Sequence, residues 1–142
     1  MKLTFDVDRL LPVTVDLQER LEQIANESGK LTSTTHALTF NFRDTSYSAE
    51  SGGWHPVEIR IVRLNDQWIF DYITDFSYSG GPYPELVKEV DFNFASGTAS
   101  FMYVPEVAIS DSNVCDFYQV WEMNFLAYVG MRVFDEIEIT AQ

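Results

Sequence analysis

Alternating apolar and polar residues run through most of this chain, and a period of two is typical of strands that bury one face. The alternation predicts strands around Leu3, Phe5 and Val7 and at about residues 35–43, 57–64, 67–76, 88–95, 98–104 and 131–140. Apolar residues at helical spacing instead predict helices at about residues 14–28 and 111–129. The pattern therefore favours an α+β fold, in which a twisted antiparallel meander is packed by an N-terminal helix and a long apolar C-terminal helix.

The two predicted helices differ in how much of their surface is apolar. The first should end at Gly29 and has a single apolar stripe, formed by Leu17, Leu21, Ile24 and Ala25. The second, which Asp111 or Ser110 can cap and Gly130 can end, is apolar nearly all round. A helix of that kind is expected to be buried on every side. In so small a protein this favours packing on the sheet and on a partner chain, through residues such as Phe117, Trp121, Phe125 and Tyr128.

Side-chain alternation also assigns strand residues to the two faces of the sheet. In the strand at 67–76 one face receives Trp68, Phe70, Tyr72 and Phe76, and the other receives Asp71 and Asp75. In the last strand one face receives Val133, Ile137 and Ile139, and the other receives Phe134, Glu136 and Glu138. The dipeptide Asn65-Asp66 predicts a tight turn between two neighbouring strands.

Acidic residues gather at the positions that this alternation points outward: Glu58, Asp71, Asp75, Glu89, Asp91, Glu136 and Glu138. Like charges that face each other across strands are destabilising. Such a face is therefore either well solvated or neutralised by a cationic ligand. Solvation is the simpler interpretation, because surface charges contribute little individually.

A polar insert from Asp44 to Pro56 separates two predicted strands, and connections of this length are usually functional or disordered. Residues 77–87 repeat its Ser-Tyr-Ser and Gly-Gly pattern. Alternate connections of a meander lie at the same end of the sheet, so we expect the two loops side by side. Together they pool Tyr47, Trp54, His55, Tyr78 and Tyr83. Rigid loop aromatics are typical contact residues, although they also close the ends of cores.

Composition and charge narrow the classes of partner. The 142 residues fit one domain, residues 1–142, and the net charge is −13. Residues 64–142 hold 13 acidic residues and two basic ones. This charge disfavours nucleic acid and anionic membranes, which need positive patches, and favours cationic partners. No apolar run is long enough for a membrane span, and acids near the N-terminus interrupt any signal-peptide core, so we expect a cytoplasmic protein.

No spacing of residues in the chain matches a catalytic, cofactor or metal-binding motif. His55 has Asp44, Glu50 and Glu58 as nearby partners for a general base, but a hydrogen-bonded structural histidine is favoured. Cys115, the single cysteine, excludes an internal disulfide. The sequence therefore predicts no catalytic residue, no metal and no cofactor.

The segment from Phe40 to Arg60, with its Asn-Phe-Arg-Asp and His-Pro-Val-Glu-Ile-Arg pieces, resembles a family of gamma-proteobacterial proteins, a domain of unknown function. The similarity runs from the first predicted helix to the last strand. The fold of that family resembles that of the mitochondrial glycoprotein family, whose best-known member is an acidic, complement-binding matrix protein. The resemblance implies helices packed on a twisted antiparallel sheet, ring-shaped trimers and many cationic partners.

Functions from different classes remain open at this point. In the first, a non-catalytic binding or adaptor protein engages a basic protein or peptide through its acidic face and aromatic loop end, and its second helix packs a homo-oligomer. In the alternative, a small-molecule-binding protein or enzyme has a pocket at the 44–56 and 77–87 loops, where Arg43, Asp44, Tyr47 and His55 converge. A third interpretation is an acidic protein that neutralises a toxin or mimics nucleic acid, which requires carboxylates spaced like phosphates.

Overall fold

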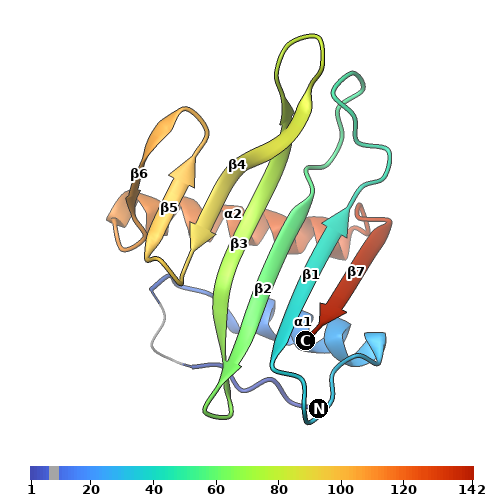
Figure 1. Cartoon of the computed structure of the whole chain (residues 1–142), viewed down its shortest axis with the longest axis vertical. Coiled ribbons are helices and arrows are strands. Elements are labelled where there is room, and N and C mark those ends of the chain that lie inside the picture. Colours follow the sequence, from blue (N-terminus) through green and yellow to red (C-terminus); the bar gives the residue numbers. More distant parts are fainter. Residues whose placement is uncertain (7–9) are drawn as a thin grey trace.

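Seven antiparallel strands form one twisted sheet in the computed structural model of the chain, which describes residues 1–6 and 10–142 (Figure 1). The strands lie in the order β6-β5-β4-β3-β2-β1-β7. Their bounds are β1 Ala37–Arg43, β2 Val57–Leu64, β3 Gln67–Ser79, β4 Glu85–Asn93, β5 Thr98–Phe101, β6 Val104–Ala108 and β7 Glu136–Ala141. The first six strands follow one another as a meander, and β7 pairs with the outer edge of β1. The predicted α+β meander is confirmed.

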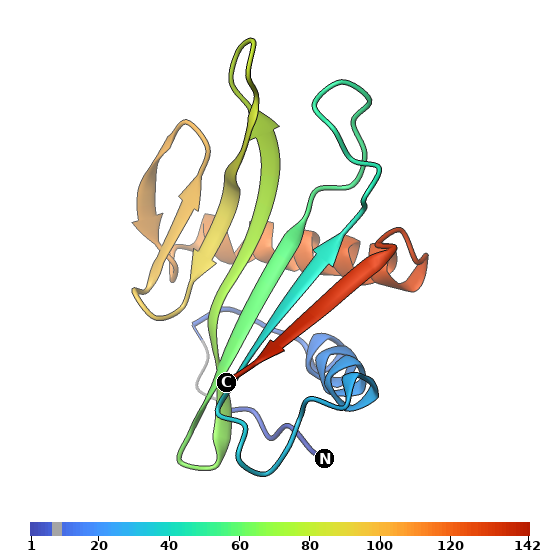
Figure 2. The same ribbon diagram turned by 45° about the vertical axis from the view of Figure 1, so that its right-hand side comes forward.

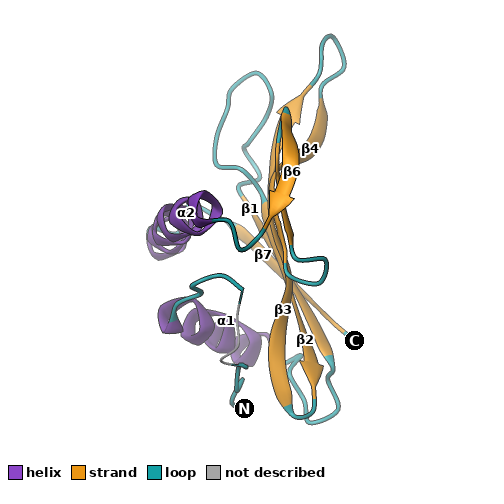
Figure 3. Ribbon diagram, turned by 90° about the vertical axis from the view of Figure 1, so that its left-hand side faces the viewer, coloured by secondary structure: helices purple, strands orange, loops and turns teal. Residues whose placement is uncertain are grey.

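Both helices, α1 (Val15–Ser28) and α2 (Ser112–Gly130), pack on the same face of the sheet (Figure 3). From α1 the predicted stripe supplies Leu17, Leu21 and Ala25, none of which is exposed. The strands meet the helices with fully buried inward residues, among them Leu38, Phe40, Phe42, Ile59 and Ile61. One hydrophobic core therefore lies between the helices and this face of the sheet.

Helix and turn boundaries fall at residues suited to them. Thr14 caps the start of α1, and Gly29 ends it in the left-handed conformation, with φ 72°. Asp111 caps α2. Asn65 and Asp66 have φ values of 52° and 64°, the two positive values that a type I′ hairpin turn requires.

A β-bulge in β3 reverses part of the predicted face assignment. Arg60 pairs with Tyr72 and Ile61 pairs with Phe70, so Asp71 is an extra residue in β3. Beyond it, Tyr72 and Phe76 lie on the face away from the helices, and Asp75 lies on the helix-covered face beside Val57. The prediction that put these two aromatics with Trp68 and Phe70, and Asp75 on the open face, was wrong.

The C-terminal half of the sheet departs from the pattern in two further places. The strand expected at 98–104 is a hairpin, because Tyr103 takes φ 65° and turns the chain from β5 into β6. The last strand begins only at Glu136, so Phe134 precedes it and packs at 5.7 Å, between ring centroids, from buried Phe42. Phe134 was wrongly placed beside the outward glutamates.

The first predicted strand is reduced to a single bridge in the described residues. Phe5 bridges Trp68 in parallel, and the amide of Asp6 donates to the Trp68 carbonyl at 3.0 Å. Val7, the third residue of that prediction, lies outside the described residues.

One side of α2 is exposed in the single chain. The helix buries Val114, Tyr118, Glu122 and Phe125, whereas Phe117, Val120 and Met123 are exposed. Burial on every side is therefore not achieved within one chain. In the described part of the chain, neither helix has the length and hydropathy to cross a membrane.

Candidate functional site

The insert between β1 and β2 is held in shape by two carboxylates. Asp44 accepts hydrogen bonds from the Ser46 hydroxyl at 2.6 Å and from the Trp54 amide at 3.0 Å. These bonds, the Ser46 bond foremost, lower the pKa of Asp44. At the loop base, Asp135 accepts from the amide of Thr45 at 2.8 Å, which ties the insert to the segment before β7. The shape of the loop therefore depends on Asp44 within it and on Asp135 at its base.

The β1–β2 and β3–β4 loops project beyond the same end of the sheet (Figure 2). The Tyr47 ring lies 5.1 Å from the ring of Tyr78 and 5.4 Å from that of His55, and its hydroxyl accepts from the Tyr78 amide at 3.0 Å. The structure thus brings these three of the five expected loop residues together. Trp54 instead packs 4.4 Å from Tyr128 of α2, and Tyr83 is 89% exposed.

A groove of about 470 Å³ lies between the two loops and β7. Its lining joins residues of both predicted binding sets, Tyr47 and Tyr78 from the loops and Glu136 and Glu138 from β7. The remaining lining residues are Arg43, Asp44, Thr45, Pro56 and Leu86. Three carboxylates and a single guanidinium therefore surround two tyrosines.

Three more of the predicted acids, Glu58, Asp71 and Asp91, each have a partner on the sheet. Glu58 accepts from the Tyr72 hydroxyl at 2.7 Å, and burial together with this bond raises the pKa of Tyr72. Asp71 pairs with Arg60 at 2.6 Å. Asp91 is buried and accepts from the Thr74 hydroxyl at 2.7 Å. These three carboxylates are therefore paired one by one, and Glu136 and Glu138 lie apart from them in the groove.

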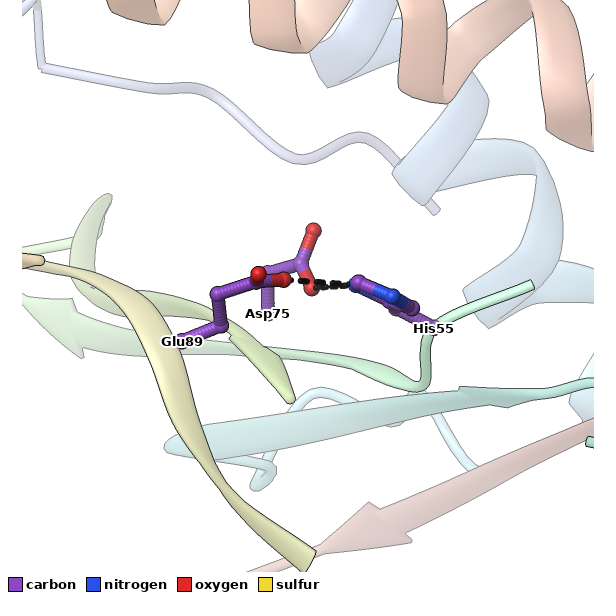
Figure 4. Close-up of side chains that lie close together, drawn as sticks. All are labelled: His55, Asp75 and Glu89. Carbon is purple, nitrogen blue, oxygen red and sulfur yellow. Dashed lines mark hydrogen bonds and ion pairs between the residues drawn. The ribbon is translucent and has the colours of Figure 1, made fainter. Parts of the chain in front are cut away.

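His55 joins the two remaining acids (Figure 4). Its Nδ1 lies 3.0 Å from Oδ1 of Asp75 and 2.7 Å from Oε2 of Glu89. A second bulge explains this convergence, because Asp75 pairs with Val90 and Phe76 with Lys88, which leaves Glu89 as an extra residue in β4. None of the partners expected from sequence proximity, Asp44, Glu50 or Glu58, contacts the ring in the described hydrogen bonds and ion pairs.

Carboxylates dominate the electrostatics of this cluster. The hydrogen bond to Asp75 raises the pKa of His55, burial opposes it, and the charges of Asp75 and Glu89 add to the rise. Oδ2 of Asp75 accepts from Nε1 of Trp121 at 3.0 Å, so α2 fixes the carboxylate from the other side. Trp121 was expected only as a packing residue, and its role depends on the bulge that turns Asp75 inward.

An aromatic cavity of about 250 Å³ adjoins the cluster on the helix side of the sheet. His55 and Asp75 form its polar wall. The other lining residues are mainly apolar: Gly53, Trp54, Val57, Trp121, Asn124, Phe125, Tyr128 and Phe134. The cavity and the acidic groove are two different hollows near the same loop.

The fold and these hollows define a small α+β domain with its helices on one face of a seven-stranded sheet. The chain belongs to the family described as "Protein of unknown function (DUF2787)", whose model matches residues 15–140. No curated protein matches the chain. The predicted family resemblance is confirmed.

Two solved structures from Vibrio cholerae show the same fold. The hypothetical protein VC0508, from the VSP-II pathogenicity island, is 42% identical with a TM-score of 0.91, and the match covers 99% of this chain and 100% of that one. The conserved hypothetical protein VC1805, from island VPI-2, is 40% identical with a TM-score of 0.82, covering 93% and 97%. VC1805 is described as sharing structural homology with the human P32 protein, which agrees with the mitochondrial-glycoprotein-like fold.

Proposed function

We propose that the protein is a non-catalytic binding protein that holds a segment of a basic protein or peptide in the groove between its two loops. The observation that carries the proposal is the groove lining, in which Asp44, Glu136 and Glu138 surround Tyr47 and Tyr78. The Nε of Arg43, the one cation of the lining, donates to Asn41 at 2.7 Å. With three carboxylates against this one guanidinium, the groove lining has a net negative charge.

The chemistry of the lining suits lysine and arginine side chains. Carboxylates bind guanidinium and ammonium groups by charge-assisted hydrogen bonds, and tyrosine faces attract cations. The net charge of −13 would steer a basic partner toward the protein. The resemblance to the mitochondrial glycoprotein family, which implies cationic partners, supports the same class of ligand.

Salt dependence tests this proposal. We expect a fluorescent peptide of alternating lysine and arginine to bind at 50 mM NaCl, and its affinity to fall at least about tenfold at 500 mM NaCl, because exposed charge pairs are screened as the Debye length shortens. Fluorescence anisotropy measures the dissociation constant at each salt concentration, and a peptide of alternating glutamate and serine is the control. No binding at low salt, or an affinity indifferent to salt, would contradict the proposal.

The second candidate function, binding or turnover of a small molecule, is favoured by the aromatic cavity that holds His55. Its residues differ from those expected for this alternative. Arg43, Asp44 and Tyr47 line the acidic groove, and His55 lines the cavity. A small-molecule site would therefore be built from His55, Asp75 and the α2 aromatics.

We also propose a homo-oligomer that covers the exposed apolar side of α2, where Val120 is 54% and Met123 is 64% exposed. Sedimentation equilibrium of the purified protein should then give a mass above the 16.3 kDa of one chain. A mass of one chain at micromolar concentration would contradict the proposed homo-oligomer.

The cytoplasmic location of the protein stays a prediction.

A further inference from the structure

Three potential ligand atoms converge at the edge of the aromatic cavity. We propose that His55, Asp75 and Glu89 bind a divalent transition-metal ion through one imidazole nitrogen and two carboxylate oxygens. His55 lies in the segment that leads into β2, Asp75 lies in β3 and Glu89 lies in β4. None of the three residues lines the acidic groove, so the proposed metal site does not depend on the proposed peptide binding.

Distances between the ligand atoms fit a metal centre. The imidazole Nδ1 lies 3.0 Å and 2.7 Å from the two carboxylate oxygens, and all three atoms lie within 4.8 Å of one another. Bonds of about 2.0–2.2 Å to a tetrahedral ion place ligand atoms about 3.3 Å apart. Moving Nδ1 a few tenths of an ångström away from the two oxygens would therefore bring these two distances to the value of a metal site.

The two carboxylates need more hydrogen-bond donors and more positive charge than His55 alone supplies. One imidazole nitrogen carries at most one hydrogen, yet two anionic oxygens lie within hydrogen-bond distance of it. A protonated His55 supplies only one positive charge to the two acids that lie against it. A divalent ion bound to all three groups would compensate both charges.

The surroundings position these ligands as outer residues of metal sites do. Nε1 of Trp121 donates to the Asp75 oxygen that does not face His55, which fixes the carboxylate. The bulge in β4 directs Glu89 toward the site, and bulges occur preferentially beside functional residues. The bond from the Trp54 amide to Asp44 holds the residue just before His55.

The donor set indicates the class of ion. Calcium and magnesium prefer oxygen ligands alone, whereas imidazole together with carboxylates suits zinc, manganese or cobalt. Three protein ligands leave a coordination position open. Because His55 and Asp75 also line the cavity, a small molecule in that cavity would reach the ion.

Isothermal titration calorimetry of the EDTA-stripped protein with ZnCl₂ tests the proposal. We expect one ion per chain, and binding at least about tenfold weaker in His55→Gln and in Glu89→Gln. His36→Gln replaces the other histidine and Glu85→Gln an exposed acid of the same β3–β4 hairpin, and both controls should retain wild-type affinity. Binding that is absent, or unchanged in the two site variants, would overturn the proposal.

A second measurement on the wild-type protein covers the case in which a site variant fails to fold. Substoichiometric MnCl₂ should broaden the amide NMR signals around residues 55, 75 and 89 before all others, because paramagnetic relaxation falls steeply with distance. Broadening centred elsewhere, for example on the exposed acids of α1, would also overturn the site.

Discussion

Replacing Glu122 with alanine should lower the free energy of unfolding by about 3 kcal/mol, since the change removes the acceptor of the buried Tyr118 hydroxyl and of two Thr14 donors at the start of α1. Glu122 lies in the apolar helix α2 and is only 2% exposed. Its carboxylate accepts from the Tyr118 hydroxyl at 2.6 Å and from the Thr14 amide at 3.2 Å, and also from the Thr14 hydroxyl. Thr14 caps α1, so the negative charge also faces the positive end of that helix.

Urea denaturation followed by circular dichroism measures this loss. Asp116→Ala removes an exposed carboxylate from the same helix and should change the free energy of unfolding by less than about 0.5 kcal/mol. Equal effects of the two substitutions would mean that the contacts of Glu122 with Tyr118 and with the start of α1 add no more stability than an exposed carboxylate does.

Replacing Gly53 with alanine should cost about 2–3 kcal/mol of stability and disturb the loop that carries His55. Gly53 has φ 138°, which residues with a Cβ rarely adopt. A Cβ there would lie 2.8 Å from Oδ2 of Asp44 and 3.0 Å from the Cα of Tyr47. The Asp44 bond to the Trp54 amide would have to lengthen or break.

The neighbouring glycine provides a matched control in the same loop. Gly52 has φ 71°, and a Cβ added there meets nothing within 4 Å. Gly52→Ala should therefore cost only the strain of the left-handed conformation, about 1–2 kcal/mol. Thermal unfolding of both variants measures the difference, and a smaller loss in Gly53→Ala than in Gly52→Ala would contradict the described loop packing.

The sequence predicts this fold well wherever the hydrophobic periodicity and the capping or turn residues indicate the same element. Leu38, Phe40 and Phe42 alternate without interruption, and all three are fully buried. Gly29, the expected end of the first helix, ends α1 in the left-handed conformation. The apolar residues of α2 likewise predict a helix. Periodicity alone does not predict that Glu122, which has apolar neighbours in the sequence, is buried.

The candidate site is harder to predict because two bulges build it. An extra residue at Asp71 turns Asp75 toward the helices, and an extra residue at Glu89 directs that carboxylate to His55. A bulge leaves no clear trace in a period-two pattern, so both acids were assigned to an open face. Loop adjacency, by contrast, follows from meander topology, which is why Tyr47, His55 and Tyr78 lie together as expected.

The groove is lined by residues that are far apart in the sequence. Glu136 and Glu138 reach it because β7 pairs with β1 after the chain has passed through α2. Register places Glu138 opposite Asn41 and Glu136 opposite Arg43, beside the start of the first loop. Strand order of this kind depends on tertiary packing, so neither acid could be assigned to the loop end from the sequence.

Peptide affinity of a groove variant tests the central claim most directly. Glu136→Gln with Glu138→Gln removes two charges from the groove, and Glu19→Gln with Glu27→Gln removes two exposed charges from α1, so both variants have the same net charge. We expect the groove variant to bind the lysine–arginine peptide about tenfold more weakly than wild type at 50 mM NaCl, a loss of about 1.4 kcal/mol. The α1 variant should bind within about twofold of wild type, and equal losses in both variants would show that overall charge, and not the groove, binds the peptide.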